Sequence, residues 1–487
     1  MNMPNRDPER IPPPESYRRW RRYLGWFALL SAVGLVYASL IPLNFYFQPL
    51  ETAFSGFTHA PWLNLGIYKR ADWVANALVV LPIGFAGTGA ICLGRQAKLQ
   101  HVFAVAFLVA AIMFLIAAIE FVQVWFPPRT VSLNDIAAGW LGSLLGPPLW
   151  LLAGGPLVNH LLRAQTTSDP DSRKASFCVW LLAAYLTCLC IWSLLPGDLI
   201  LSKHELMVKY EAGRIAMVPG SELASATGSR DFLGKVISLF GSVVKLVPLG
   251  FLAFISKIEA RKKICLLVCV PTALELLQLP VFSRHFSTSD VLLGWLGAWL
   301  GWCLAGQTDR LIALNRLLIV RYALLLLNVS VILVAFSFGA TRLATAAEIE
   351  TRWTQFFSWP FVRYYYGTEF SAGFNLLMKA FLFLTLGLAL ANLISKYAKS
   401  PRHCRQIRVC MLILVAAFGF LLELMQIALI PCVPDASDTF VYVSGAIGGF
   451  LLWDWFDRES RHEREPTADT PQSYRNTPPK GIAKGRW

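Results

Sequence analysis

Charged residues are scarce in this sequence. Asp, Glu, Lys and Arg make up 15% of the 487 residues, against about 25% in soluble globular domains, while 55% of the residues are hydrophobic. A soluble protein cannot bury that much apolar surface. The apolar residues also come in blocks of about 20, the length needed to cross a hydrocarbon core. The composition therefore excludes a soluble protein and predicts an all-α integral membrane protein.

The sequence also lacks the motifs of metal and covalent chemistry. None of the ten cysteines lies in a CxxC pair with ligand-like partners, and nearly all fall in apolar blocks or basic loops, so neither a disulfide framework nor a zinc site is expected. No HExxH or GxSxG pattern is present, so no catalytic residue can be assigned. We expect no metal and no cofactor.

Basic residues exceed acidic ones, with a formal net charge of +14. They sit in short clusters between the apolar blocks rather than in one patch, which disfavours a nucleic-acid partner. Clusters of this kind mark the cytoplasmic loops of membrane proteins. We therefore expect both termini in the cytoplasm.

Twelve apolar blocks are candidate membrane spans. They are 24–44, 73–93, 102–125, 133–154, 177–197, 236–256, 263–281, 288–306, 317–338, 372–394, 408–430 and 437–454. The long segments 45–72, 198–235 and 339–371 fall on the outer side, where their aromatic stretches suit the membrane surface.

The sequence repeats itself, and the spacing of the repeated residues is its most informative feature. Each copy begins with a glutamate. It is followed by a glutamine, an arginine, an aspartate and three glycines, which lie 3, 9, 15, 19, 22 and 26 residues after that glutamate. The first copy is Glu120, Gln123, Arg129, Asp135, Gly139, Gly142 and Gly146, and the second is Glu275, Gln278, Arg284, Asp290, Gly294, Gly297 and Gly301.

A third copy is degenerate. It keeps Glu423, Gln426 and Asp438, with Cys432 in place of the arginine and Tyr442 in place of the first glycine. The pattern predicts three tandem four-helix units in parallel orientation. The predicted segments are a basic cytoplasmic N-terminus at 1–23, units at 24–160, 161–312 and 313–455, and a disordered cytoplasmic tail at 456–487.

The repeated residues have a structural and a functional interpretation. Glycines at these offsets trace one stripe of a helix and let two helix backbones approach closely. The short connection between the third and fourth helices brings Glu120, Arg129 and Asp135 together at the outer end. They form either a buried ion-pair cluster that holds the hairpin shut or an outward-facing polar pocket. We favour the structural interpretation for Asp135 and the functional interpretation for Glu120 with Arg129.

The first copy alone carries Asp72 and Asn76 one turn apart on its second helix. Residues four apart share a helix face, so both could line the same pocket. If one copy is a working site, the first is therefore expected to be that copy.

The pattern Asp72-x3-Asn76-x5-Pro82-x-Gly84, followed by Glu120-x2-Gln123, Arg129 and Asp135, resembles the VanZ-like family of bacterial membrane proteins. The resemblance is strongest in the first unit, good in the second and weaker in the third, and three units depart from the family's usual single one. The family is named for a glycopeptide-resistance accessory protein, and its members lack an established catalytic activity. The resemblance implies an inner-membrane protein acting at the cell envelope.

Three functions stay open at this point. An envelope accessory protein, with membrane lipids and a lipid-linked or cell-wall glycan ligand as partners, comes first. A transporter is second, because transport sites lie near mid-membrane whereas the repeated charges lie near the outer helix ends. An integral-membrane hydrolase or transferase acting on a lipid-linked substrate is third.

The charge pattern predicts the topology. In a variant whose accessible native cysteines are replaced, a cysteine at Gln96 should resist an impermeant maleimide applied to intact cells, because its loop is expected to be cytoplasmic. A cysteine at Thr130, in the connection predicted to face outward, is the matched control and should react. Labelling at residue 96 in intact cells would contradict the topology.

Overall fold

The structure is a computed structural model of the whole chain. It describes residues 14–62, 64–96, 98–166, 170–224, 227–256, 258–337, 340–367, 369–397 and 400–462. The predicted tail from residue 456 lies partly in α18, which continues to His462, and otherwise outside the described residues.

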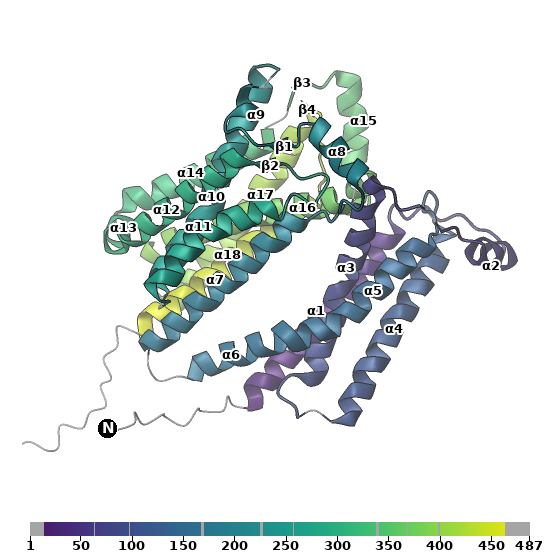
Figure 1. Cartoon of the computed structure of the whole chain (residues 1–487), viewed down its shortest axis with the longest axis horizontal. Coiled ribbons are helices and arrows are strands. Elements are labelled where there is room, and N and C mark those ends of the chain that lie inside the picture. The colour runs from purple at the N-terminus through teal and green to yellow at the C-terminus, as the bar shows by residue number, and fades with distance from the viewer. Residues whose placement is uncertain are drawn as a thin grey trace, which may run out of the picture. The chain divides into compact units, whose positions relative to one another are not determined.

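The described residues are mainly helical (Figure 1), and their elements are divided along the chain into three consecutive groups. The first group is α1 (Pro14–Leu40), α2 (Leu50–Thr58), α3 (Ile67–Cys92), α4 (Leu99–Gln123), α5 (Leu133–Leu149), a π-helical turn (Trp150–Gly154) and α6 (Gly155–Thr166). The second is α7 (Pro170–Leu194), α8 (Lys203–Glu211), β1 (Ile215–Ala216), α9 (Ser221–Ala224), α10 (Ser229–Ile255), α11 (Ala260–Leu276), β2 (Phe286–Ser287), α12 (Thr288–Ala305) and α13 (Thr308–Asn315). The third is α14 (Leu318–Ser337), β3 (Arg342–Leu343), α15 (Ala346–Phe356), a 3-10 turn (Val362–Tyr366), α16 (Glu369–Tyr397), α17 (Pro401–Ile427), β4 (Leu429–Ile430) and α18 (Asp438–His462).

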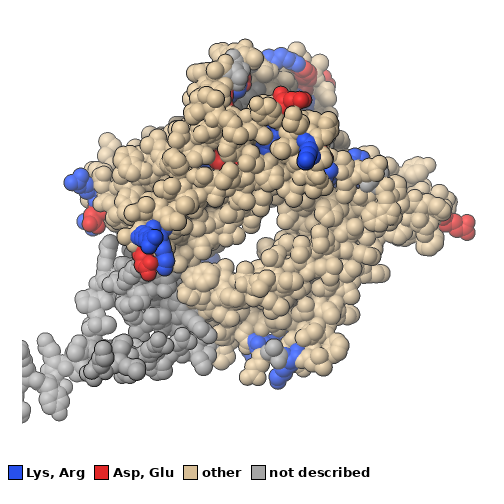
Figure 2. Space-filling model, in the orientation of Figure 1, with Lys and Arg blue, Asp and Glu red and all other residues tan. Residues whose placement is uncertain are grey.

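Among the described residues, eight helices are long and apolar enough to cross a membrane. They are α1, α3, α4, α5 with its continuation to Leu162, α10, α14, α16 and α17. The visible face carries few charged side chains (Figure 2), and large apolar side chains such as Phe107 and Phe114 are exposed on α4. The chain thus fits an all-α, multi-pass membrane protein.

The predicted count of twelve spans stays a prediction. Each predicted range overlaps a helix, but α7, α11, α12 and α18 are not among the eight. In α7 the described apolar part is only Cys178–Leu194, and α11 has 17 residues.

The second and fourth helices of the first group are packed backbone against backbone. A methyl group added to Gly84 of α3 would lie 3.0 Å from the carbonyl oxygen of Ser143 on α5, and one added to Gly142 would overlap the Ala77 carbonyl. Gly139 instead faces Ile116 of α4. The stripe therefore serves two neighbouring helices, because small residues let helix backbones approach closely.

The second group repeats this contact between α10 and α12. A methyl group on Gly297 would overlap the Val243 carbonyl, and one on Gly250 would overlap the Ala298 carbonyl. Gly294 faces Leu246 and Pro271.

In the third group, a large residue on the fourth helix packs against a glycine on the third helix. Tyr442 of α18, where the other copies have glycine, is fully buried and lies against Gly419 of α17. Its ring stacks on Phe383 with centroids 4.2 Å apart. A large residue here is thus matched by a glycine on the facing helix, which keeps the interior filled.

The long connection that follows the first helix of each group is attached to the connection between the third and fourth helices. In the first group, the amide of Tyr46 donates to the carbonyl of Trp125. In the second, β1 pairs with β2 in parallel, and in the third β3 pairs with β4 antiparallel. These segments carry the short helices α2, α8 and α15 and cover the hairpins.

The glycine contacts predict opposite effects for two matched substitutions. Gly297→Ala should destabilise the protein by about 1–3 kcal/mol, because the methyl group would push α12 away from the α10 backbone. Gly241→Ala, on α10 with no atom within 4 Å of the added methyl, should be neutral or stabilise by up to ~1 kcal/mol through helix propensity. Thermal unfolding in detergent measures both. Equal shifts of the same sign would contradict the packing.

Candidate functional site

Each repeated glutamate lies at the hairpin end of its helix and is buried. The amide of Ser132 donates to Glu120 Oε2 at 3.4 Å, and the amide of Asp435 donates to Glu423 Oε2 at 2.8 Å. Both donors lie 12 residues after the glutamate, just before the fourth helix. A carboxylate at a helix N-terminus is favoured by the orphan amides and the helix dipole. The glutamates therefore hold the start of the next helix.

The second glutamate has a different set of partners. The side-chain amide of Gln278 donates to Glu275 Oε1 at 2.8 Å, and Lys245 Nζ lies 3.7 Å from the same oxygen. The amide of Ser287 also interacts with this carboxylate. Glu275 Oε2 itself is buried and has no hydrogen-bond partner.

Ser132, Ser287 and Asp435 also cap the helices that follow them, and the sequence analysis did not select them. Ser132 Oγ accepts the Asn134 amide, and Ser287 Oγ accepts the Asp290 amide. Asp435 Oδ1 accepts the amide of Ser437. The signal was present as Ser/Asp-x-x-Asp ahead of an apolar run, which is typical of helix N-termini.

The two repeated arginines cap the first helix of their groups. Arg129 donates from Nε to the Ile41 carbonyl at 2.7 Å and from Nη2 to the Ala38 carbonyl at 2.6 Å. The last carbonyls of a helix have no intrahelical partner, and a cation there is favoured by the helix dipole.

Arg284 makes the same pair of contacts, from Nε to Leu195 at 2.5 Å and from Nη2 to Trp192 at 2.6 Å. The guanidinium also lies 4.9 Å from the centre of the Trp192 ring. Burial lowers the pKa of Arg284. Both arginines are therefore engaged with helix ends, which favours the structural interpretation of this position.

Lys209, on α8, binds the turn that follows α11, a contact that the sequence did not predict. Its side chain is fully buried. Its ammonium donates to three carbonyls, those of Gln278, Leu279 and Val281, at 2.6 to 2.9 Å. Burial lowers the pKa of Lys209 to about 8, and the three acceptors satisfy all its donors.

Arg352, on α15, does the same for α17 in the third group, where Cys432 replaces the repeated arginine. Its Nη2 donates to the carbonyls of Gln426, Leu429 and Cys432 at 2.5 to 3.2 Å. Lys209 and Arg352 lie on the short helices α8 and α15, outside the repeated spacing, so only the fold reveals their shared role.

The first group brings its predicted site residues together. Asn76 Nδ2 donates to Asp135 Oδ1 at 2.8 Å, and Asp72 lies close enough to Asp135 to interact electrostatically. Glu120 interacts electrostatically with both Asp135 and Arg129. Gln123 turns elsewhere and donates to the carbonyl of Ser39 at 2.9 Å. In the first cluster Asn76 and Asp135 therefore bond to each other, while Gln123 and Arg129 bond to the end of α1.

The repeated aspartates of the other groups have different partners. Ser242 bonds to Asp290, but Asp290 Oδ1 is buried without a hydrogen-bond partner. In the third group the Tyr364 hydroxyl donates to Asp438 Oδ1 at 2.8 Å. Burial raises the pKa of Tyr364, which keeps this hydroxyl a donor.

Glu222, on α9, is a further acidic group beside the second cluster. Its carboxylate accepts hydrogen bonds from the hydroxyls of Ser287 and Ser289. The second cluster therefore holds three carboxylates, of which Glu275 and Asp290 interact with Lys245 and each have one buried oxygen without a hydrogen-bond partner. Within the described residues, no group of three or more His, Cys, Asp or Glu side chains could hold a metal ion.

Comparison with known families identifies part of the chain. Residues 179–309 match the VanZ/LLP1 family model. The match covers most of the second helical group, including Lys245, Glu275 and Asp290, although the resemblance in sequence is strongest in the first. No curated protein and no solved structure matches the chain.

The caps predict a stability cost at Arg284. Arg284→Gln should lower the free energy of unfolding by roughly 1.5–3 kcal/mol, because two charge-assisted hydrogen bonds to the end of α7 are lost. Arg310→Gln removes the same charge from an exposed position on α13 and should change stability by less than about 0.5 kcal/mol. Melting temperatures that fall equally for both variants would rule out the capping role.

Proposed function

We propose that this protein is a VanZ-like accessory protein of the bacterial inner membrane that binds a lipid-linked or cell-wall ligand at the hairpin end of its helical groups. The family match supports a membrane protein of the envelope. The hairpin ends gather the polar residues of otherwise apolar helices, and buried ionisable groups of this kind mark binding sites in membrane proteins. On this proposal those ends face outward and both termini are cytoplasmic.

We further propose that the chain arose by triplication of one four-helix unit, with twelve spans in all. The support is a common register of the second and fourth helices, in which a glycine meets the carbonyl at the same repeat position. The pairs are Gly84 with Ser143, Gly250 with Ala298, and Gly387 with Ala446.

The observation that carries the binding proposal is the pair of buried carboxylate oxygens in the second cluster, Glu275 Oε2 and Asp290 Oδ1, which lack a donor. A buried acceptor without a partner costs about 1–3 kcal/mol. The hydroxyl or amide donors of a glycan or peptide would recover that energy, while Lys245 would attract an anionic group.

The second cluster is favoured over the first on this ground. Asp72 and Asn76 made the first unit the expected site, but Asn76 already bonds to Asp135. The location of these groups at helix ends also favours ligand binding over transport, whose sites lie near mid-membrane.

The test is native mass spectrometry of the full-length protein purified with its lipids. Wild type should retain a lipid-linked glycan or cell-wall precursor, and Glu275→Gln should reduce its occupancy by about tenfold. Glutamine has one neutral carbonyl oxygen and an NH2 group, so it cannot accept hydrogen bonds at both positions as the carboxylate does. Glu120→Gln and Glu423→Gln are the matched controls from the other groups and should retain the ligand.

Melting temperatures separate binding from folding. Glu275→Gln should stay folded, because the glutamine still accepts from Gln278. Equal ligand loss in all three variants, or collapse of Glu275→Gln alone, would contradict binding at the second cluster. Loss in Glu120→Gln alone would move the site to the first unit.

A further inference from the structure

A cavity of about 640 Å³ lies at the other end of the first helical group, away from its hairpin. It is bordered by the start of α1, the end of α3, the start of α4, and the π-helical turn between α5 and α6. None of the polar clusters described above contributes to it.

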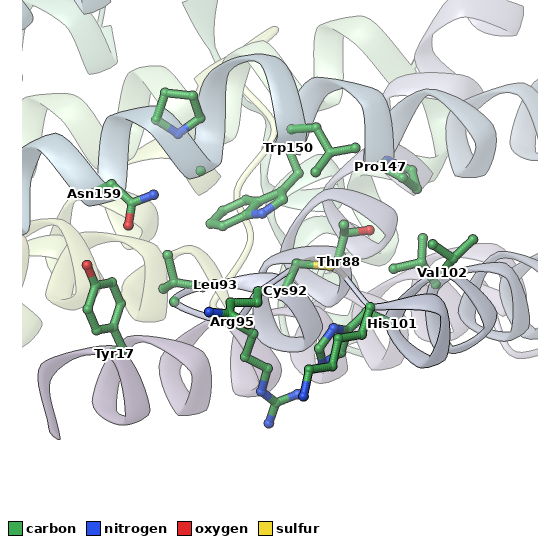
Figure 3. A pocket seen from close by; sticks show the side chains of 17 residues that line it. Tyr17, Thr88, Cys92, Leu93, Arg95, His101, Val102, Pro147, Trp150 and Asn159 are labelled. Carbon is green, nitrogen blue, oxygen red and sulfur yellow. The ribbon is translucent and has the colours of Figure 1, made fainter. Parts of the chain in front are cut away.

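The π-helical turn shapes this cavity. Pro147 and Pro148 stand at the end of α5, and proline has no amide to donate to the preceding turn. The amide of Gly155 then bonds to the Trp150 carbonyl, as a π-helical turn requires. Such turns occur frequently at functional sites. Figure 3 shows the Trp150 indole projecting between Thr88 and Asn159, with Arg95 and His101 along another edge.

The polar side of the cavity is cationic. Arg95, Lys98 and His101 line it, and no acidic residue is among the described residues that do. Arg21, which donates to the Leu93 carbonyl at 3.1 Å, is near enough to Arg95 for mutual repulsion. Like charges held together are destabilising, and an anion between them would relieve the repulsion.

The other side of the cavity is apolar and open to the surroundings. Val102 and Leu151 line it and are 62% and 63% exposed, on helices that can cross a membrane. An exposed apolar surface contributes nothing to the binding of a soluble anion, whereas it can pack against an acyl chain. Basic pockets between transmembrane helices are suited to lipid headgroups.

We propose that this cavity binds an anionic phospholipid, with its phosphate between Arg95 and Lys98, its headgroup toward Asn159, and its acyl chains along Val102 and Leu151. The site differs in place and ligand from the hairpin-end site proposed above. The phospholipid proposal does not depend on whether the hairpin-end site binds a cell-wall ligand.

The experiment places full-length protein in nanodiscs of phosphatidylcholine containing a small fraction of phosphatidylglycerol. Native mass spectrometry then counts the phosphatidylglycerol molecules retained after release from the disc. The double variant Arg95→Gln/Lys98→Gln should weaken retention by about tenfold or more, because each cation near the surface contributes roughly a factor of five to anionic-lipid affinity.

The matched control is Arg261→Gln/Lys262→Gln, which removes the same charge from the first turn of α11 in the second group, where neither residue lines the cavity. It should retain the lipid. A third variant, Gln96→Glu, adds a carboxylate at an exposed cavity-lining position. It should weaken retention without a loss of melting temperature, which keeps the test valid if the double variant is unstable.

Two results would overturn the proposal. One is equal retention by wild type and all three variants. The other is displacement of the lipid by millimolar inorganic phosphate, or phosphate binding of equal strength without lipid, which would assign the cavity to a free anion.

Discussion

The close approach of the second and fourth helices is the constraint on which the rest of this structure depends. In the second group the backbones of α10 and α12 are so near that a methyl group on Gly250, Gly297 or Gly301 would overlap a carbonyl oxygen. In a membrane there is no hydrophobic force between helices, so packing of this kind must supply the association. The third and first helices are then arranged around that pair.

Charged side chains also stabilise the helix ends, with carboxylates at helix starts and cations at helix C-termini. Carboxylates such as Glu120 and Glu423 meet the amides that precede a helix, while Arg129 meets the carbonyls that end α1. Both choices follow the helix dipole. Most of the repeated charges therefore have a structural task, and binding is inferred only where acceptors are left over, in the second cluster.

The sequence predicted the helical class and the close-packed stripe because both depend on local patterns, namely apolar blocks and glycine spacing. It also placed Glu120, Arg129 and Asp135 near one hairpin. It could not show that Arg129 points to the end of α1, because that contact joins residues 91 positions apart. Lys209 was missed for the same reason, since its acceptors lie some 70 residues away and nothing in its local sequence marks it. The caps Ser132 and Ser287 could have been found from their Ser-x-x-Asp pattern.

We propose that one helical arrangement, held by the same contacts, occurs three times in this chain. The most direct measurement is a density map of the full-length protein in lipid nanodiscs, in which the three segments are superposed. The account predicts that Glu120, Glu275 and Glu423 fall at equivalent depths, each facing the amide 12 residues further along the chain. Glutamates at different depths, or a second and fourth helix in contact through large side chains instead of glycines, would contradict it.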